Sequence, residues 1–278
     1  MAAQQAAAPP PHLLLIVLEN TEFGSVIGNV GAAPYLNALA GRYALATRYF
    51  ASAHPSLPNY LSLIAGSTFG LDGSDCPTCM VQGRALTDEL TAHGVGWTAY
   101  MDGIPSPCFN GPSGTGAHPY ARKHDPFLYF PQNLTGPCHV VPLTKMAADL
   151  ATGRASPFLW ISPDLCNDGH DAVCGLPAAD SWTARTLPGI LASSWYQQGG
   201  TVLVVWDEGT SDLGCCAGAY GGHIAAIVVS QRVSPTTRLA SPLDHAGALR
   251  GIEELYGVGL LGASANPANG DLLPLLHG

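Results

Sequence analysis

Short apolar runs alternate along the chain with longer segments in which apolar residues recur at helical spacing. The runs are bounded by Gly, Pro or polar residues, and most contain β-branched or aromatic side chains, as buried strands do. We therefore predict strands over residues 13–18, 96–101, 158–162, 201–206 and 224–230. The other segments predict helices over residues 33–43, 57–65, 85–93, 142–150, 178–198 and 244–256. This alternation is typical of an α/β fold with a mostly parallel central sheet and helices on both faces.

One stretch, residues 102–142, breaks the alternation. It is rich in Pro, Gly, Asn and Ser, and it contains Cys108 and Cys138. A connection of this length in a compact domain is usually functional. Because no internal repeat and no linker separates two cores, we expect a single domain over residues 1–278 with a loop or lid inserted at about 102–142.

The charge pattern argues against some partners. Only 11 Lys and Arg are present in 278 residues, they are scattered, and the net charge is −9. A nucleic acid is not an expected partner, because no basic cluster would attract its phosphates. The longest apolar run, residues 13–18, is far shorter than the ~20 residues that a membrane-spanning helix needs. We expect no transmembrane segment and no obligate protein partner.

The eight cysteines lie mostly in Gly- and Pro-rich stretches, which indicates disulfides and an oxidising compartment. We therefore expect a secreted or periplasmic protein. Its first residues, Met-Ala-Ala-Gln-Gln, lack the charged start of a secretory signal, which we expect to have been removed. The alternative, a zinc site at Cys76 and Cys79, lacks a second pair at finger spacing. Proximity predicts the pairs Cys76–Cys79, Cys108–Cys138 and Cys166–Cys174, whereas adjacent Cys215 and Cys216 are expected to reach separate partners.

Acidic and amide side chains follow two of the predicted strands directly. Glu19 and Asn20 come after residues 13–18, and Asp207 and Glu208 come after residues 201–206. Either pair alone would be ordinary turn or capping residues. Ligands of open α/β sheets bind beyond the carboxyl ends of the strands, and oxygen ligands suit a hard cation. The two pairs together predict one divalent metal ion, with Ca²⁺, Mg²⁺, Mn²⁺ and Zn²⁺ all compatible.

Ser56 is a candidate nucleophile. It lies in the segment His-Pro-Ser-Leu-Pro-Asn-Tyr, where Pro58 suits the first turn of a helix and places Ser56 at its N-terminus. The helix dipole and the free backbone N–H groups there bind phosphate and favour the alkoxide of a serine. A simple N-cap is the competing interpretation of Ser56.

Two histidines in polar loops are candidate phosphate ligands. His170 lies in the polar run 162–171 after a predicted strand, and His124 lies in Lys-His-Asp-Pro-Phe of the insert. An imidazolium can neutralise an oxyanion and release a proton near neutral pH. His223 and His245 are weaker candidates, and five others are expected at the surface: His12, His93, His118, His139 and His277.

Seven short motifs in order carry a resemblance to a known family. They are Leu-Glu-Asn at 18–20, the segment around Ser56, Lys-His-Asp-Pro-Phe, the run up to His170, Trp-Asp-Glu-Gly at 206–209, Gly-Gly-His-Ile at 221–224 and Asp-His-Ala-Gly-Ala-Leu-Arg at 244–250. Over roughly residues 13–265 the chain resembles the bacterial phosphoesterase family of secreted acid phosphatases and phospholipases C. This family belongs to the alkaline-phosphatase-like superfamily. The chain is most similar to the short acid phosphatases, which include phosphatidylinositol 3-phosphate phosphatase.

The resemblance implies a phosphomonoesterase that works through a phosphoserine at Ser56 and acts on phosphate monoesters, including phosphoinositides. It implies that His124 and His170 bind the phosphoryl group where two-metal relatives hold a second ion, with His170 as general acid. Two imidazolium groups would favour mildly acidic pH. Asn59 and His223 are further catalytic candidates. The implied ligands of the single metal ion are Glu19, Asn20, Ser56, Asp207 and Glu208.

Two alternatives remain open at this point. A phospholipase C-type phosphodiesterase would use the same groups on a diester. A protein without catalytic activity could use the same cation to bind a phosphorylated ligand.

Overall fold

The computed structural model describes residues 8–277, which build one mixed sheet of nine strands. Strand β1 (Leu13–Leu18) lies in the middle, between β5 (Phe158–Ser162) and β6 (Thr201–Trp206), and is parallel to both. All six residues of β1 are fully buried. Its continuous apolar run is explained by this central place, because both faces of the strand are covered.

The remaining strands extend the sheet on both sides. On the β5 side, β3 (Trp97–Met101) and then β4 (Val140–Pro142) continue it in parallel. On the β6 side, β7 (His223–Ser230) and β2 (Ala44–Phe50) are antiparallel to their preceding neighbours. Two short strands pair in parallel with β2, namely β8 (Arg238–Leu239) and β9 (Leu243–Asp244). The predicted α/β fold with a mostly parallel sheet is confirmed.

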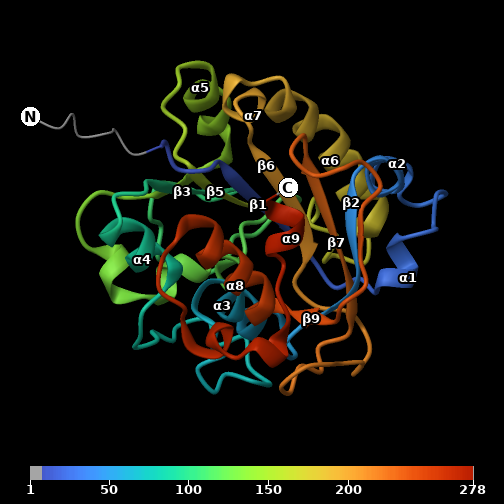
Figure 1. Cartoon of the computed structure of the whole chain (residues 1–278). Coiled ribbons are helices and arrows are strands. Elements are labelled where there is room, and N and C mark those ends of the chain that lie inside the picture. The colour runs from blue at the N-terminus through green and yellow to red at the C-terminus, as the bar shows by residue number, and fades with distance from the viewer. Residues whose placement is uncertain (1–7, 278) are drawn as a thin grey trace, which may run out of the picture.

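Helices cover the two faces of this sheet (Figure 1). One layer holds α2 (Pro34–Arg42), α5 (Met146–Ala151), α6 (Gly175–Leu191) and α7 (Ser194–Gln197), with α1 (Phe23–Val26) near its edge. The other holds α3 (Ser56–Ala65), α4 (Leu86–Ala92), α8 (His245–Tyr256) and α9 (Leu273–Leu276). Within residues 8–277, no helix has the length and apolar character needed to cross a bilayer.

Several elements differ from the sequence prediction: the short strands β4, β8 and β9 were not predicted, and within the predicted helix 142–150 the α-helix begins only at Met146. The predicted helix 178–198 is two helices, because the chain breaks after α6 and Ser193 caps α7 by accepting a hydrogen bond from the backbone N–H of Tyr196. Strand β2 was not predicted. Its sequence, Ala-Leu-Ala-Thr-Arg-Tyr-Phe, mixes small and charged residues with apolar ones and therefore lacks the run that marks the other strands.

The inserted segment packs into the molecule more closely than a hinged lid would. It forms three 3₁₀ helices, η1 (Arg122–His124), η2 (Pro126–Tyr129) and η3 (Pro131–Leu134), and a further one, η4 (Leu143–Lys145), leads into α5. Residues 127–130 are fully buried. Both η1 and η2 contact α3. The second half of the insert is therefore part of the core and fixes the position of η1.

All eight cysteines are in disulfides, which excludes the zinc alternative. The three pairs predicted from proximity are confirmed. The prediction that Cys215 and Cys216 reach separate partners is wrong, because they pair with each other. An antiparallel β-bridge joins the backbones of Cys215 and Ala219, so the chain reverses direction here. Cys216 takes a left-handed conformation with φ 66°. The other six cysteines are already paired, so the turn leaves these two sulfurs only each other.

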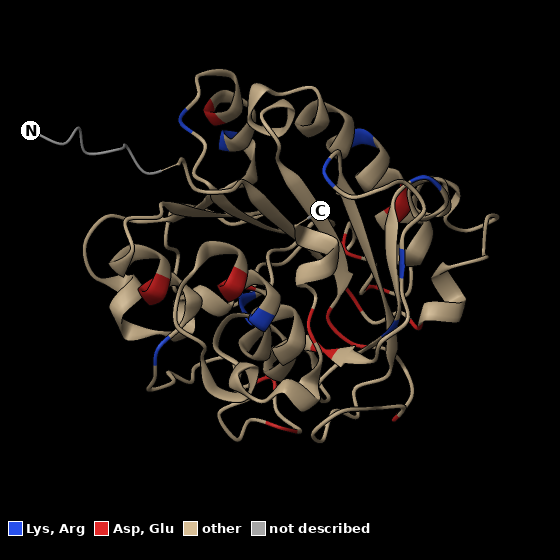
Figure 2. Ribbon diagram, viewed as in Figure 1, with Lys and Arg blue, Asp and Glu red and all other residues tan. Residues whose placement is uncertain are grey.

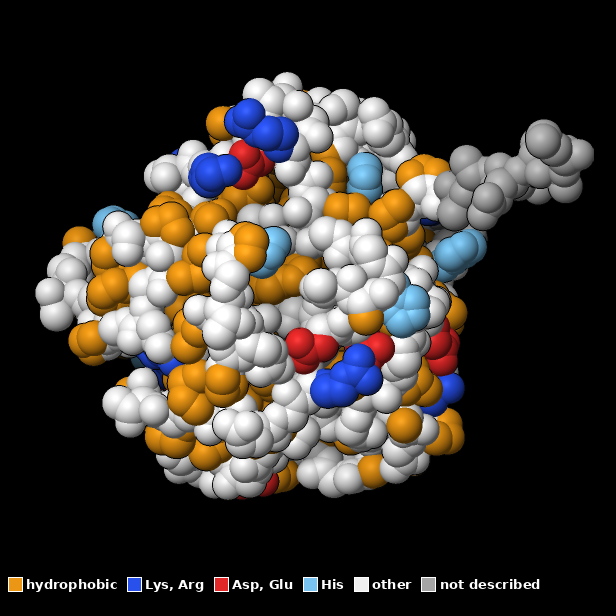
Figure 3. All heavy atoms as spheres, turned by 90° about the vertical axis from the view of Figure 1, so that its left-hand side faces the viewer, with side chains coloured by type: hydrophobic (Ala, Val, Ile, Leu, Met, Phe, Trp, Pro, Cys, Tyr) orange, Lys and Arg blue, Asp and Glu red, His pale blue; other side chains and the backbone are white. Residues whose placement is uncertain are grey.

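Charged side chains are unevenly distributed. Acidic segments gather at one end of the central strands, at the lower end in Figure 2. On the face in Figure 3, the few basic side chains lie in small groups beside acidic ones. Ion pairs of this kind join Lys145 to Asp149 and Arg84 to Glu89. Negative charge is thus concentrated at one end of the central strands.

We expect Asp180→Ala to destabilise the protein by about 1–2 kcal/mol, the usual cost of losing a helix cap. Helix α2 has no cap of its own, and Asp180 of α6 accepts hydrogen bonds from the backbone N–H groups of Leu36 (2.8 Å) and Tyr35 (3.3 Å). Chemical denaturation measures the change, and Asp180→Asn, which keeps one acceptor oxygen, should lose less. Equal stability of Asp180→Ala and the wild type would contradict this role.

Candidate active site

The carboxyl ends of β1 and β6 bring two acidic residues together. The register of the two strands pairs Leu18 with Trp206, so Glu19 and Asp207 leave the sheet side by side. The backbone N–H of Asn20 donates to Asp207 Oδ1 at 3.0 Å, and the backbone N–H of Asp207 donates to the carbonyl oxygen of Leu18 at 2.9 Å. The two predicted pairs of residues thus meet at one edge of the sheet.

Three carboxylates at this edge of the sheet are buried. Glu19 and Asp207 are fully buried, and Glu208 is 5% exposed. Burial, and next to it the charge of Asp207, raises the pKa of Glu19 well above its usual value. Burial and then Glu208 raise the pKa of Asp207 to about 7. Asp207 Oδ2 is buried without a hydrogen-bond partner among the described residues. A cation is the partner that would relieve this repulsion.

Ser56 opens helix α3 and points its hydroxyl at these carboxylates. Its Oγ donates to Glu19 Oε2 at 3.0 Å and has Glu208 Oε1 at 3.3 Å. The Nζ of Lys123, from η1, lies 3.4 Å from the same oxygen. Ser56 is 1% exposed. The hydroxyl therefore has both carboxylates that can accept its proton and an ammonium beside it. A serine that only caps a helix needs neither.

Asn59 has a different place from the one expected. Its side chain is fully buried and turned back on the loop before α3. Its Oδ1 accepts from the backbone N–H of Ala53 at 3.0 Å, and its Nδ2 donates to the carbonyl oxygens of Ala53 (2.8 Å) and Pro55 (3.1 Å). These bonds use its amide group to hold the turn that carries Ser56. The structure therefore gives Asn59 a supporting position rather than a catalytic one.

Lys123 was quoted in a motif but not predicted as a site residue. Its Nζ donates to Asp75 Oδ2 at 2.8 Å and to His170 Nε2 at 3.2 Å, besides its approach to Ser56. Burial lowers the pKa of Lys123, but Glu19 and Asp75 outweigh it and raise the pKa above the ordinary value. Its place directly before His124 was the available sequence signal.

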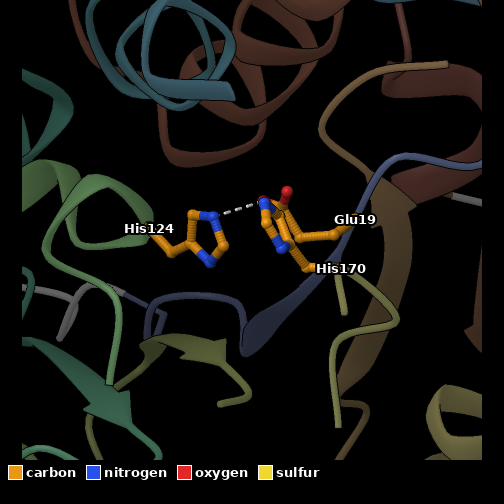
Figure 4. Close-up of side chains that lie close together, drawn as sticks. All are labelled: Glu19, His124 and His170. Atoms are coloured by element: carbon orange, nitrogen blue, oxygen red, sulfur yellow. Dashed lines mark ion pairs between the residues drawn. The ribbon is translucent and has the colours of Figure 1, made fainter. Parts of the chain in front are cut away.

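The two predicted histidines lie together at the site (Figure 4). His124 is buried, with Nε2 3.1 Å from Glu19 Oε1 and Nδ1 3.1 Å from Asp168 Oδ2. These pairs are close without hydrogen-bond geometry. The centroids of the His124 and His170 rings are 5.7 Å apart, and ligand atoms of Glu19, His124 and His170 lie within 4.8 Å of one another. The histidine cluster is thus a second group able to bind a cation or an anion.

The surroundings of the two histidines disfavour their charged forms. Burial, followed by the charge of Lys123, lowers the pKa of both His124 and His170. The Lys123 ammonium also donates to His170 Nε2, which requires an unprotonated nitrogen there. These directions do not favour the expected pair of imidazolium groups, which stays a prediction, and Lys123 supplies a positive charge at this place.

Three further residues support the site and were missed. Tyr60 lies one helical turn after Ser56, and its hydroxyl donates to Glu19 Oε1 at 2.7 Å. His54 pairs through Nδ1 with Glu208. Asp168 is fully buried beside His124, and burial raises its pKa to about 8. Spacing of four residues from Ser56 was the signal for Tyr60.

His223 and His245 have other partners. His223 Nε2 donates to the carbonyl oxygen of Thr47 at 3.0 Å, and its ring stacks on Phe23 and Phe50. The structure does not bring it to Ser56, so the catalytic assignment of His223 is not supported. His245 is fully buried and donates through Nε2 to the carbonyl oxygen of Asp207 at 2.6 Å. It therefore supports the backbone of an acidic site residue.

Comparison with solved structures concerns the fold. The chain shares its fold with a protein of the alkaline phosphatase superfamily from Vibrio parahaemolyticus, and the match covers 94% of this chain and 71% of that protein, with a TM-score of 0.62 and 13% identity. A sulfatase from Pseudoalteromonas sp. covers 95% and 70%, with a TM-score of 0.57 and 11% identity. The chain belongs to the Phosphoesterase family, whose model matches residues 29–259.

Curated relatives agree with this membership. A phosphatidylinositol-3-phosphatase of Mycobacterium tuberculosis is 32% identical over 260 residues, which are 90% of this chain and 78% of the relative. A phosphate-repressible acid phosphatase of Penicillium chrysogenum is 29% identical over 199 residues, 70% of this chain and 47% of the relative. The chain thus spans about half the length of the fungal protein. Family and relatives together make this chain a phosphoric ester hydrolase.

Proposed function

We propose that this protein is a metal-dependent phosphomonoesterase that works through a phosphoserine at Ser56. The observation that carries the proposal is the setting of the Ser56 hydroxyl. It lies at the N-terminus of α3, 3.0 Å and 3.3 Å from the carboxylates of Glu19 and Glu208 and 3.4 Å from the ammonium of Lys123. One oxygen atom therefore has the groups that accept its proton and a cation that attracts a phosphoryl group.

In the first step Ser56 Oγ attacks phosphorus and gives its proton to Glu19 or Glu208. The Oγ–P bond forms while the bond to the leaving oxygen breaks on the opposite side, and that oxygen takes up a proton from solvent. Lys123 stabilises the nonbridging oxygens, since its ammonium is held over Ser56. Because Ser56 is 1% exposed, the groups that cover its hydroxyl must open a path as the phosphoryl group enters.

In the second step water attacks the phosphoserine, the Oγ–P bond breaks, and Ser56 Oγ takes back the proton held by Glu19 or Glu208 as inorganic phosphate leaves. His170 is suited to take the proton from this water, since its Nε2 lies 3.2 Å from the ammonium of Lys123, which itself approaches Ser56. It acts as this base in addition to the expected role of general acid. His124, held between Glu19 and Asp168, orients the phosphoryl group from the other side.

The buried carboxylates are the groups that we propose for one divalent cation. The unpartnered Oδ2 of Asp207 and the raised pKa values at this place are the features that support it. A divalent cation bound there supplies Lewis-acid stabilisation of charge on the phosphoryl oxygens. The ammonium of Lys123, 3.2 Å from His170 Nε2, disfavours a second cation at the histidine cluster. The residues that would hold the ion are Glu19, Asn20, Ser56, Asp207 and Glu208.

We expect the affinity for this cation to depend on pH. Protons compete with a metal for a carboxylate, and burial with the neighbouring Glu208 sets the pKa of Asp207 to about 7. The dissociation constant for Mn²⁺ should fall by up to about tenfold per unit as pH rises from about 5.5 to 7, and it should level off above. Isothermal titration calorimetry measures it, and an affinity independent of pH would contradict the shared carboxylate site.

The substrate that we propose is a phosphate monoester, including the phosphoinositide class named for the mycobacterial relative. The test is hydrolysis of a monoester and a diester of the same alcohol, side by side, with and without chelator. Turnover of the monoester alone, lost with chelator and restored by a divalent cation, supports the proposal. Faster turnover of the diester would favour a phosphodiesterase, and turnover of neither would favour a binding protein.

The disulfides support a place outside the reducing cytosol. Four disulfides account for every cysteine, and such bonds persist in oxidising compartments. We infer that the protein is secreted or periplasmic. Fractionation of the native host, followed by thiol labelling of the protein without reduction, tests this, since cytosolic protein with free thiols would contradict it.

A further inference from the structure

The loop between α3 and α4 places one carboxylate against the catalytic lysine. Asp75 Oδ2 accepts from Lys123 Nζ at 2.8 Å, and its Oδ1 accepts from the backbone N–H of Leu57 at 3.0 Å. Leu57 is the residue directly after Ser56. One carboxylate therefore joins the first turn of the nucleophile helix to the 3₁₀ helix that carries Lys123.

The segment around Asp75 is itself held in place on both sides. The backbone N–H of Gly73 donates to the carbonyl oxygen of His54 at 2.7 Å. The hydroxyl of the buried Tyr129 donates to the carbonyl oxygen of Cys76 at 3.1 Å, and Cys76 is bonded to Cys79. Asp75 thus lies in a short loop whose backbone is held by hydrogen bonds and a disulfide. Its carboxylate can therefore keep Lys123 in one position.

The charges around Lys123 explain why an anchor is needed. Two buried carboxylates, on Glu19 and Asp207, attract its ammonium. The ion pair that the structure gives Lys123 is with Asp75, which is only partly buried. Without that outer partner the ammonium would be drawn inward onto the carboxylates of the proposed cation site. It would then no longer meet a phosphoryl group on Ser56.

We propose that Asp75 is a positioning residue, which holds the ammonium of Lys123 over Ser56 for the phosphoryl group. The proposal rests on the function proposed above for Ser56. Asp75 acts on the substrate through Lys123 and does not itself contact the reacting atoms. Because the ammonium contacts the phosphoryl group both in bound substrate and in the transition state, its loss should affect KM at least as strongly as kcat.

The test is Asp75→Asn, which keeps an acceptor oxygen for the Leu57 N–H but presents no charge to Lys123. We expect kcat/KM for a monoester to fall about 10- to 100-fold, mainly through KM. The inhibition constant of inorganic phosphate should rise about tenfold. Asp75→Glu should recover most of both. The control is Asp72→Asn in the same loop, an exposed residue that should behave as the wild type.

A double-mutant cycle separates positioning from a merely structural cap. If Asp75 acts through Lys123, then Asp75→Asn should cost nothing further in a Lys123→Met background. Multiplying effects would overturn the proposal, as would phosphate binding to Asp75→Asn that is unchanged or tighter than in the wild type. An inactive Ser56→Ala with a normal Asp75→Asn would refute the role of Asp75 alone, whereas an active Ser56→Ala would refute the proposed function itself.

Discussion

Ser56→Ala is expected to lower kcat for a phosphate monoester by about 10³-fold or more, because it removes the atom that forms the bond to phosphorus. The variant should keep its affinity for inorganic phosphate within a few-fold, since Lys123 and the carboxylates stay in place. Steady-state kinetics gives the first quantity and competition with phosphate in a binding assay gives the second. The helix should be intact, because Ala is tolerated at its first position.

The matched control is Ser62→Ala in the same helix. Ser62 is also buried, but its Oγ bonds to Ser52 Oγ at 2.8 Å rather than to a carboxylate. We expect it to keep the turnover of the wild type. Rapid acid quenching of the wild type with substrate, followed by peptide mass spectrometry, should find phosphate on Ser56. Turnover by Ser56→Ala within tenfold of the wild type would show that another group, or water, attacks phosphorus directly.

Addition of a divalent cation to the chelated protein is expected to raise its melting temperature by about 5–10 °C. The three buried carboxylates repel one another without a cation, so an ion that binds only the folded state stabilises it. Binding at about 100 times the dissociation constant contributes ~2.7 kcal/mol. For a chain of this size, each kcal/mol corresponds to roughly 2–4 °C. Differential scanning fluorimetry measures the shift without any substrate.

Asp207→Asn should abolish most of this thermal shift and lower kcat/KM by on the order of 10²-fold, a typical loss for one electrostatic group at a reacting centre. Without added cation the variant should melt no earlier than the wild type, since it removes one of the repelling charges. Asp212→Asn, whose carboxylate is 93% exposed in the neighbouring loop, is the control and should respond as the wild type. A full thermal shift in Asp207→Asn would place the cation elsewhere.

The fold was predictable where residues are buried on both sides. The five predicted strands exist because apolar runs bounded by turns have few other uses, and the acidic residues after β1 and β6 meet because parallel strands end at one edge. Strand β2 escaped because it lies towards one side of the sheet, and exposed positions within it break the apolar run. Local pattern thus identifies central strands better than outer ones.

The sequence could point to candidate site residues where the side-chain type itself suggests chemistry. Ser56, His124 and His170 stood out because few structural roles call for them in those loops. Lys123 and Asp75 did not, because a lone lysine and a lone aspartate are ordinary surface residues until tertiary contacts pair them. Asn59 was predicted as a catalytic candidate from its type, but its amide group binds the backbone of its own loop.

The central position of β1 has a consequence for biosynthesis. This strand is synthesised before its two neighbours, β5 and β6, which follow some 140 to 190 positions later. Until they arrive, six consecutive aliphatic side chains have no native partner and must be shielded from other nascent chains. The same delay means that Glu19 acquires its neighbour Asp207 only after the long segment between them has been made. Enzyme activity regained during refolding would therefore report the closing of the whole sheet, not the formation of any early fragment.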